Sequence, residues 1–97
     1  MNIINYIPVG KKNAVTRTEL CMMTGQSDRI IRRQIHEARR EHVIINLQDS
    51  QGYYRPDMSQ ESEIAEIRRF LVQEEKRLRS IGWSLKSARM ALREASQ

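Results

Sequence analysis

The sequence predicts a mainly helical fold with one small β-hairpin, in which a winged helix-turn-helix domain precedes a long C-terminal helix. Two helix-like segments are separated by a short turn that contains Gly25. Two strand-like stretches flank the turn-like "DSQG". Beyond about Ser59, apolar or small residues recur at spacings of three and four. Because 97 residues provide only one small core, we divide the chain into a domain of residues 1–57 and a helix within residues 58–97.

The segment before the first core helix is expected to be only partly regular. "NIINYIP" fits one or two helical turns that stop at Pro8, because the residue before a proline avoids helical dihedral angles. Gly10 to Asn13 is loop-like, and Ala14 with Val15 could form a short strand.

The first core helix is predicted from about Arg17 to Met23. Thr16 stands three residues before Glu19, the spacing of a capping box, in which each side chain accepts a hydrogen bond from the other residue's backbone N–H. Gly25 then permits a tight turn. Helix, short turn with glycine and a second helix form the layout of a helix-turn-helix motif.

The second helix is predicted over residues 28–41. Ser27 is a good N-cap, and the negative charge of Asp28 suits a helix N-terminus. "HVIINLQ" is rich in β-branched residues, and "YYRP" ends at Pro56, which cannot extend a ladder, so a hairpin is expected. The resulting order of helix, strand, two helices and two strands describes a winged helix.

The C-terminal segment begins with acidic residues and continues with basic ones, which complements a helix dipole. Its apolar positions fit a heptad pattern that only Glu74 interrupts, so one unbroken helix that pairs with a second copy is the simplest interpretation. The alternative is a helical hairpin, in which Gly82 ends one helix and Ser84 caps the next. In an unbroken helix Trp83 lies outside the pattern, so we expect it to cover a neighbouring helix or the domain. The predicted oligomerisation residues, called the seam below, are Ile64, Ile67, Leu71, Leu78, Ile81, Leu85 and Leu92, and Ala88 and Ala95 continue the pattern.

Five arginines of the second helix fall on one face. At about 100° per residue they share an arc with His36, opposite Ile31 and Ile35, which must be buried. A solvated amphipathic helix shows the same pattern, and Glu37 and Glu41 could pair with some arginines. The choice of arginine over lysine favours nucleic acid, because a guanidinium makes bidentate hydrogen bonds to phosphates and guanine edges. The second helix of this motif is also the one that enters the major groove.

Further contacts to DNA are expected from the hairpin and from the loop before the first helix. Strand alternation places Tyr53 and Tyr54 on opposite faces, so one ring should reach the core and the other solvent or phosphate. Lys11 and Lys12 suit either phosphate contacts or solubility. The net charge of +5 also favours a polyanionic partner. The predicted DNA-binding residues are Lys12, Ser27, Arg29, Arg32, Arg33, His36, Arg39, Arg40, Tyr53 and Arg55.

Other classes of function have little support in the sequence. No stretch approaches the ~18 apolar residues of a membrane span, and the N-terminus does not resemble a secretory signal, so a cytoplasmic protein is expected. There is no Gly-rich nucleotide loop and no Cys/His cluster, and His36 and His42 are spaced wrongly to clamp a metal. Neither catalysis nor a cofactor is expected.

The stretch "YIPVGKKNAVTRTELCMMTGQSDRIIRRQIHEARREHVIINLQDSQGYYRP", followed by a helix ending in "SLKSARMALRE", resembles small helix-turn-helix proteins of phages and prophages of Gram-positive bacteria. The shared elements are "NAV", the "SDR" cap, "RRQI" and "AR" in the second helix, and "GYY" with its proline. The resemblance implies a winged helix with a long C-terminal helix, and DNA binding by Arg29, Arg32, Arg33 and His36. The sequence departs at His42, where such proteins often carry glycine.

These observations favour a sequence-specific double-stranded DNA-binding protein, a phage or prophage transcription regulator that acts as a homodimer. One alternative is a DNA-binding structural subunit for phage genome packaging, similar to a small terminase. Another is an interaction module whose arginine face binds an acidic protein.

Overall fold

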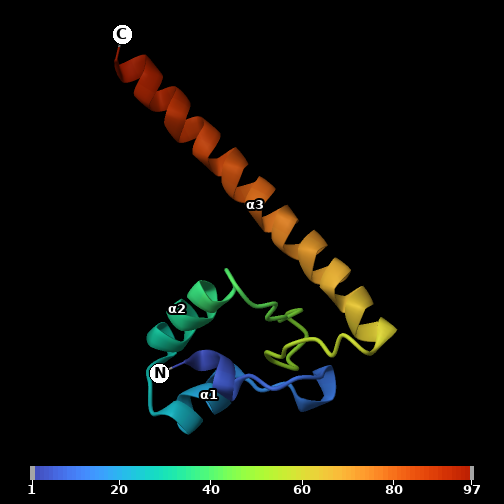
Figure 1. Ribbon diagram of the computed structural model, residues 1–97. Coiled ribbons are helices and arrows are strands. Elements are labelled where there is room, and N and C mark those ends of the chain that lie inside the picture. The colour runs from blue at the N-terminus through green and yellow to red at the C-terminus, as the bar shows by residue number, and fades with distance from the viewer. Residues whose placement is uncertain (1, 97) are drawn as a thin grey trace.

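A computed structural model describes residues 2–96, so Met1 and Gln97, the outer ends of the two predicted units, lie outside it. Two short helices, α1 (Arg17–Thr24) and α2 (Asp28–Ala38), lie within residues 2–57, which we call the N-terminal domain, and the 35-residue helix α3 (Glu61–Ala95) projects from these residues (Figure 1). Short 3₁₀ helices cover Ile3–Tyr6 and Lys11–Asn13. The mainly helical fold with a long C-terminal helix is confirmed.

The predicted caps of α1 form as expected. The Thr16 hydroxyl accepts a hydrogen bond from the Glu19 N–H, and the Glu19 carboxylate accepts one from the Thr16 N–H, both at 3.1 Å. Gly25 ends the helix with φ of 71°, a left-handed conformation that favours glycine. The short turn that follows positions α2 against α1.

Helix α2 begins at Asp28 as predicted, with the Ser27 hydroxyl accepting a hydrogen bond from the Ile30 N–H at 3.3 Å. It ends at Ala38 rather than at about residue 41. Arg39 and Arg40 therefore lie at its C-terminal end and in the following turn, where their directions depart from an ideal helix.

The core lies between the first 3₁₀ helix, α1 and α2. Ile31 and Ile35 are fully buried, which confirms the predicted inward side of α2. Burial of each such side chain contributes about 1.5–3 kcal/mol. The main core cluster contains Ile3, Ile4, Ile7, Leu20, Ile31, Ile35, Ile44 and Tyr53.

The predicted hairpin is not confirmed. Within residues 2–96 no strand is assigned, and the β-structure consists of the isolated bridges Val9–Arg55, Val15–Tyr53 and Ile45–Tyr54. Between Ile45 and Tyr53, polar side chains form local turns. The Asn46 amide oxygen accepts a hydrogen bond from the Gln48 N–H, and the Asp49 carboxylate accepts one from the Gln51 N–H. Such local hydrogen bonds compete with a ladder.

Helix α3 is unbroken, so the alternative of a helical hairpin is wrong. Gly82 lies inside the helix, and the Ser84 hydroxyl donates to the Ile81 carbonyl at 2.8 Å instead of capping a new helix. Trp83 is 75% exposed. The expectation that it covers another part of this chain is therefore wrong.

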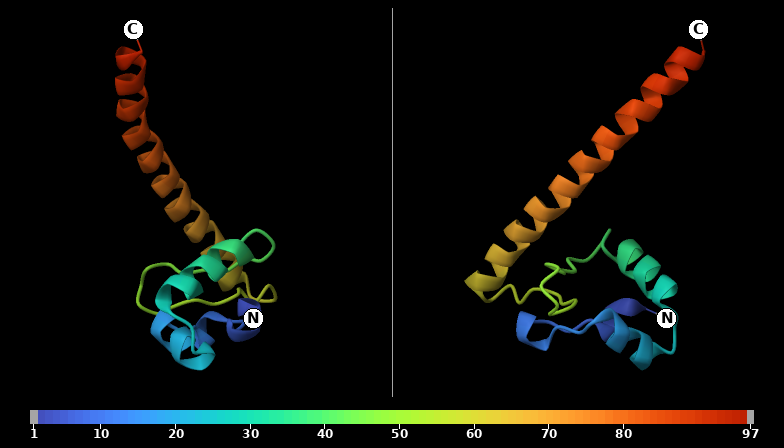
Figure 2. Two further views of the ribbon diagram at one scale, coloured as in Figure 1. Left: turned by 90° about the vertical axis from the view of Figure 1, so that its left-hand side faces the viewer. Right: turned by 180° about the vertical axis from the view of Figure 1, so that it is seen from behind.

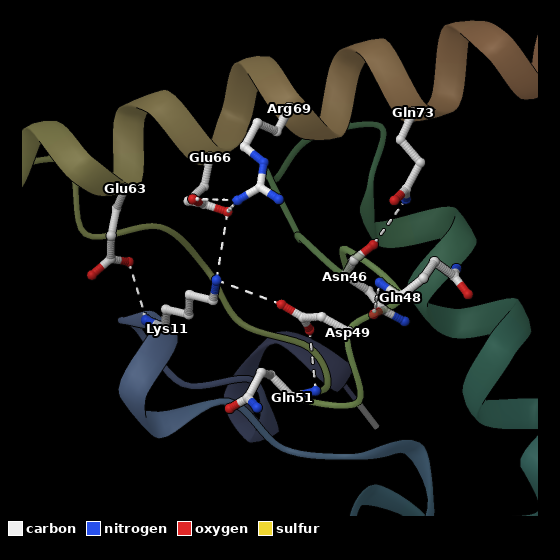
Figure 3. A network of polar contacts seen from close by, with 9 residues as sticks. All are labelled: Lys11, Asn46, Gln48, Asp49, Gln51, Glu63, Glu66, Arg69 and Gln73. Atoms are coloured by element: carbon white, nitrogen blue, oxygen red, sulfur yellow. Dashed lines mark hydrogen bonds and ion pairs between the residues drawn. The ribbon is translucent and has the colours of Figure 1, made fainter.

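A set of polar contacts fixes the first half of α3 to the N-terminal domain (Figure 3). One Glu63 carboxylate oxygen accepts hydrogen bonds from the Lys11 and Asp57 N–H groups at 3.2 and 3.0 Å. The Lys11 ammonium lies 3.6 Å from the Glu66 carboxylate, so this lysine is engaged within the protein. We call these contacts, together with the ion pair Lys11–Asp49 and the hydrogen bond from the Gln73 amide to the Asn46 carbonyl, the polar clasp.

The second half of α3 extends away from the rest of the molecule in every view (Figures 1 and 2). All side chains of residues 75–96 are exposed. We call residues 75–95 the arm. Because little of it is buried, the arm must be stabilised by its own helix propensity or by a partner.

Candidate nucleic-acid interface

Helix α2 and the turn after it present a cationic surface. The five side chains that form this surface are all exposed: Arg29, Arg32, Arg33, His36 and Arg40. Arg32 lies 3.9 Å from Asp28, a solvated pair that contributes little to stability. The other four make no ion pair within residues 2–96. The surface can therefore accept an external anion without first breaking strong internal contacts.

Arg39 was predicted to belong to this surface, but in the structure it is half-buried and engaged in internal contacts. Its Nε donates a hydrogen bond to the Ile44 carbonyl at 3.0 Å. Its guanidinium stacks 5.0 Å from the centre of the Phe70 ring and 5.9 Å from that of Tyr53. Burial lowers the pKa of Arg39. The residue thus joins the end of α2 to α3, in contrast to the exposed arginines of the cationic surface.

Arg55 is also engaged internally, because its Nε donates to the Ile7 carbonyl at 2.9 Å. Both tyrosines are buried, at 8% exposure for Tyr53 and 1% for Tyr54, so the expectation that one ring reaches solvent is wrong. The Tyr53 hydroxyl accepts a hydrogen bond from Arg17 at 3.5 Å. That bond, and then the pairing with Asp28, raises the pKa of Arg17.

Tyr54 is the more deeply buried of the two tyrosines. Burial, and then the charges of Glu66 and Glu63 on α3, raise its pKa to about 12. Its hydroxyl makes no hydrogen bond within the described residues. Tyr54 is therefore buried near the acidic first half of α3 and does not face solvent.

The remaining predicted DNA contacts stay accessible. Lys12 is exposed in the second 3₁₀ helix, and Ser27 is exposed while it caps α2. Ser27 stands next to the cationic surface, whereas Lys12 belongs to the segment that carries the polar clasp.

An open groove of about 990 Å³ separates α2 from α3. Arg32, His36 and Arg40 of the cationic surface line it from α2 and the following turn. Helix α3 contributes Arg77, which pairs with Glu74 at 2.9 Å, and two seam residues. The complete lining is Arg17, Arg32, Ile35, His36, Arg39, Arg40, Asn46, Gln48, Tyr53, Phe70, Glu74, Arg77, Leu78 and Ile81. Three residues of the cationic surface therefore line the same groove as the seam residues Leu78 and Ile81.

Phe70 and Arg77 were not among the predicted site residues. Phe70 is the only phenylalanine in the chain and lies beside the seam, which would have been a signal for packing onto the domain. No sequence signal identified Arg77, because its place in the groove depends on the angle at which α3 leaves the domain.

The seam divides into two parts. Ile64 and Ile67 are half-buried where α3 passes over the N-terminal domain. The other five are 45–72% exposed: Leu71, Leu78, Ile81, Leu85 and Leu92. Such a row of exposed apolar side chains at heptad spacing is typical of a surface that pairs with another helix.

Comparison of the chain with protein-family models, with curated proteins and with solved structures found no match. Within residues 2–96, no group of His, Cys, Asp or Glu side chains could hold a metal ion. In the same residues, no helix has both the length and the apolar character needed to cross a membrane.

Proposed function

We propose that this protein binds double-stranded DNA through α2. The observation that carries the proposal is the cationic surface of Arg29, Arg32, Arg33, His36 and Arg40, exposed on the second of two helices joined by a tight glycine turn. A helix in that position of a helix-turn-helix motif enters the major groove. Its guanidiniums match guanine edges and phosphates bidentately.

We also propose that the N-terminal domain follows the chain path of a winged helix-turn-helix domain, although no regular strands are assigned within residues 2–96. The bridges Val15–Tyr53 and Ile45–Tyr54 support it, because they join the three segments that the sequence predicts as strands. The resemblance to phage and prophage proteins supports a transcription regulator, which would act in the cytoplasm. Here α2 reads DNA, while Arg39, Arg55 and the two tyrosines stabilise the domain.

The exposed seam supports a homodimer. Two copies paired along residues 71–92 would carry two cationic surfaces related by two-fold symmetry. Such a dimer reads two half-sites about 10 bp apart or at a multiple of that spacing.

Selection of bound fragments from random duplexes, with light scattering of the same protein, tests this function. A palindromic consensus together with a dimer is the expected result. Binding should weaken steeply with salt, because each neutralised phosphate contributes a slope of about −0.9 in log K against log salt. The proposal fails if affinity is unchanged between low and physiological salt.

A second candidate is a packaging subunit, which the long exposed seam also favours. The same light-scattering measurement separates the two, since a ring of eight or more copies with no preferred sequence would indicate packaging. Binding to an acidic protein that duplex DNA does not displace would instead indicate an interaction module.

A further inference from the structure

The arm has a charge pattern unlike the rest of α3. Between Lys76 and Arg93 the sequence contains six cationic side chains and no acidic one, whereas residues 61–75 contain five glutamates and two arginines. All side chains of the arm are exposed. Of the six cations only Arg77 has an ion-pair partner within residues 2–96. The arm is thus a second cationic element, separate from α2.

The arm also carries a strip of residues on the side away from the seam. Its five members, spaced alternately by three and four, are Lys76, Arg79, Trp83, Lys86 and Met90. At about 100° per residue, Trp83 points about 140° away from Leu78 of the seam. Trp83 is 75% exposed, more than any other large apolar side chain of residues 2–96 except Met22. The strip therefore remains free when the seam pairs with a second copy.

Cations on both sides of an exposed aromatic ring fit a nucleic-acid strand. The cations contact phosphates, and the indole stacks on a base. A membrane surface fits less well, because an interfacial helix places its tryptophan in the apolar face, and here that face is the seam. From Lys76 to Lys86 the helix rises about 15 Å, the length of about four nucleotides at the ~3.4 Å spacing of a stacked strand.

We propose that the strip binds single-stranded nucleic acid, with Trp83 stacked on an unpaired base. This site would add to duplex recognition by α2, for example where DNA is opened beside the bound duplex. The inference uses the proposed pairing of the seam but does not depend on duplex binding by α2.

Trp83 is the only tryptophan in the chain, so its fluorescence reports on the strip directly. We expect a single-stranded oligonucleotide to quench it, and a fully paired hairpin duplex at equal phosphate concentration to quench it much less. The double variant Lys76→Gln, Lys86→Gln should weaken single-strand binding about tenfold, and so should Trp83→Ala. Because Trp83→Ala removes the fluorophore, its binding is measured by the anisotropy of a labelled oligonucleotide. Light scattering checks that these variants keep the association state of the parent.

The matched control is Arg29→Gln with Arg33→Gln, which removes two charges from α2. It should weaken duplex binding and leave the single-strand quenching unchanged. The proposed strip is refuted if single strands leave Trp83 unquenched, if the α2 variant abolishes the quenching equally, or if anionic phospholipid vesicles, rather than oligonucleotides, shift the emission. Loss of duplex binding alone in the α2 variant would leave the strip intact, so the two proposals fail separately.

Discussion

The Arg39 guanidinium stacks 5.0 Å from the centre of the Phe70 ring, and this contact joins the end of α2 to α3. The hydrogen bond from Arg39 to the Ile44 carbonyl holds the guanidinium in place. The Arg39–Phe70 contact and the polar clasp together set the direction in which α3 leaves the N-terminal domain. The groove that the cationic surface shares with the seam depends on this direction.

Substitution of Arg39→Lys should lower the free energy of unfolding by about 1 kcal/mol, because an ammonium can replace neither the planar stacking nor the directed hydrogen bond. Urea denaturation measures the change. Arg29→Lys is the control, since Arg29 is exposed and makes no ion pair among the described residues, and it should leave stability unchanged. Equal stability of both variants would mean that the Arg39 contacts contribute nothing.

Substitution of Arg33→Gln should weaken binding to the selected duplex by about 1–3 kcal/mol if the side chain contacts a base edge. Stability should not change, because Arg33 is exposed. Arg68→Gln, at an exposed position of α3 outside the cationic surface, removes the same charge and should have little effect. Fluorescence anisotropy with labelled duplex measures both. Comparable losses in the two variants would point to net charge rather than to a specific surface.

Substitution of Leu85→Glu should dissociate the oligomer, because it places like charges opposite each other in an apolar interface. Ser87→Glu introduces the same charge on the far side of the arm and should leave the oligomer intact. Both residues lie beyond those that line the groove, so α2 is undisturbed. Light scattering at several concentrations gives the mass. A Leu85→Glu protein of unchanged mass would show that the seam does not hold copies together.

Alkaline pH should destabilise the fold through Tyr54. The pKa of Tyr54 is about 12 against 10.0 for an ordinary tyrosine, so the unfolded chain ionises this phenol first. Its contribution is fully present below pH 10 and is lost as the pH rises toward 12. Tyr54→Phe should therefore lose less stability than the parent across this range, while Tyr6→Phe, at a 38% exposed ring, should follow the parent. Thermal melts from neutral pH to pH 12 measure this difference.

Features that depend on local chemistry were predictable from the sequence. The Thr16–Glu19 capping box, the Ser27 cap and the two sides of α2 follow from short-range rules. The continuity of α3 through Gly82 followed from the heptad spacing on either side of it. Exposed arginines on α2 could be named because each position along a helix has a defined direction.

Features that depend on long-range packing were not predictable. Arg39 was expected at the surface because nothing in the sequence showed that Phe70 of α3 would contact it. Burial of both Tyr53 and Tyr54 was not expected, because strand alternation sends neighbouring side chains to opposite faces. The hairpin was expected from its β-branched residues, but Gln48 and Ser50 adopt φ of 63° and 68°, which turns the chain away from an extended ladder. Turn formation by Asn46 and Asp49 outweighed the strand propensity around them.

The polar clasp determines how α3 acts mechanically. Gln73 makes the last polar contact with the N-terminal domain, and from there to Ala95 the helix runs about 33 Å. A tilt of about 10° at the base would move the tip by about 6 Å, roughly one helical pitch. Small rearrangements of Glu63 or Lys11 would therefore produce large displacements at the tip of α3. In a dimer paired along the seam, they would also change the distance between the two N-terminal domains.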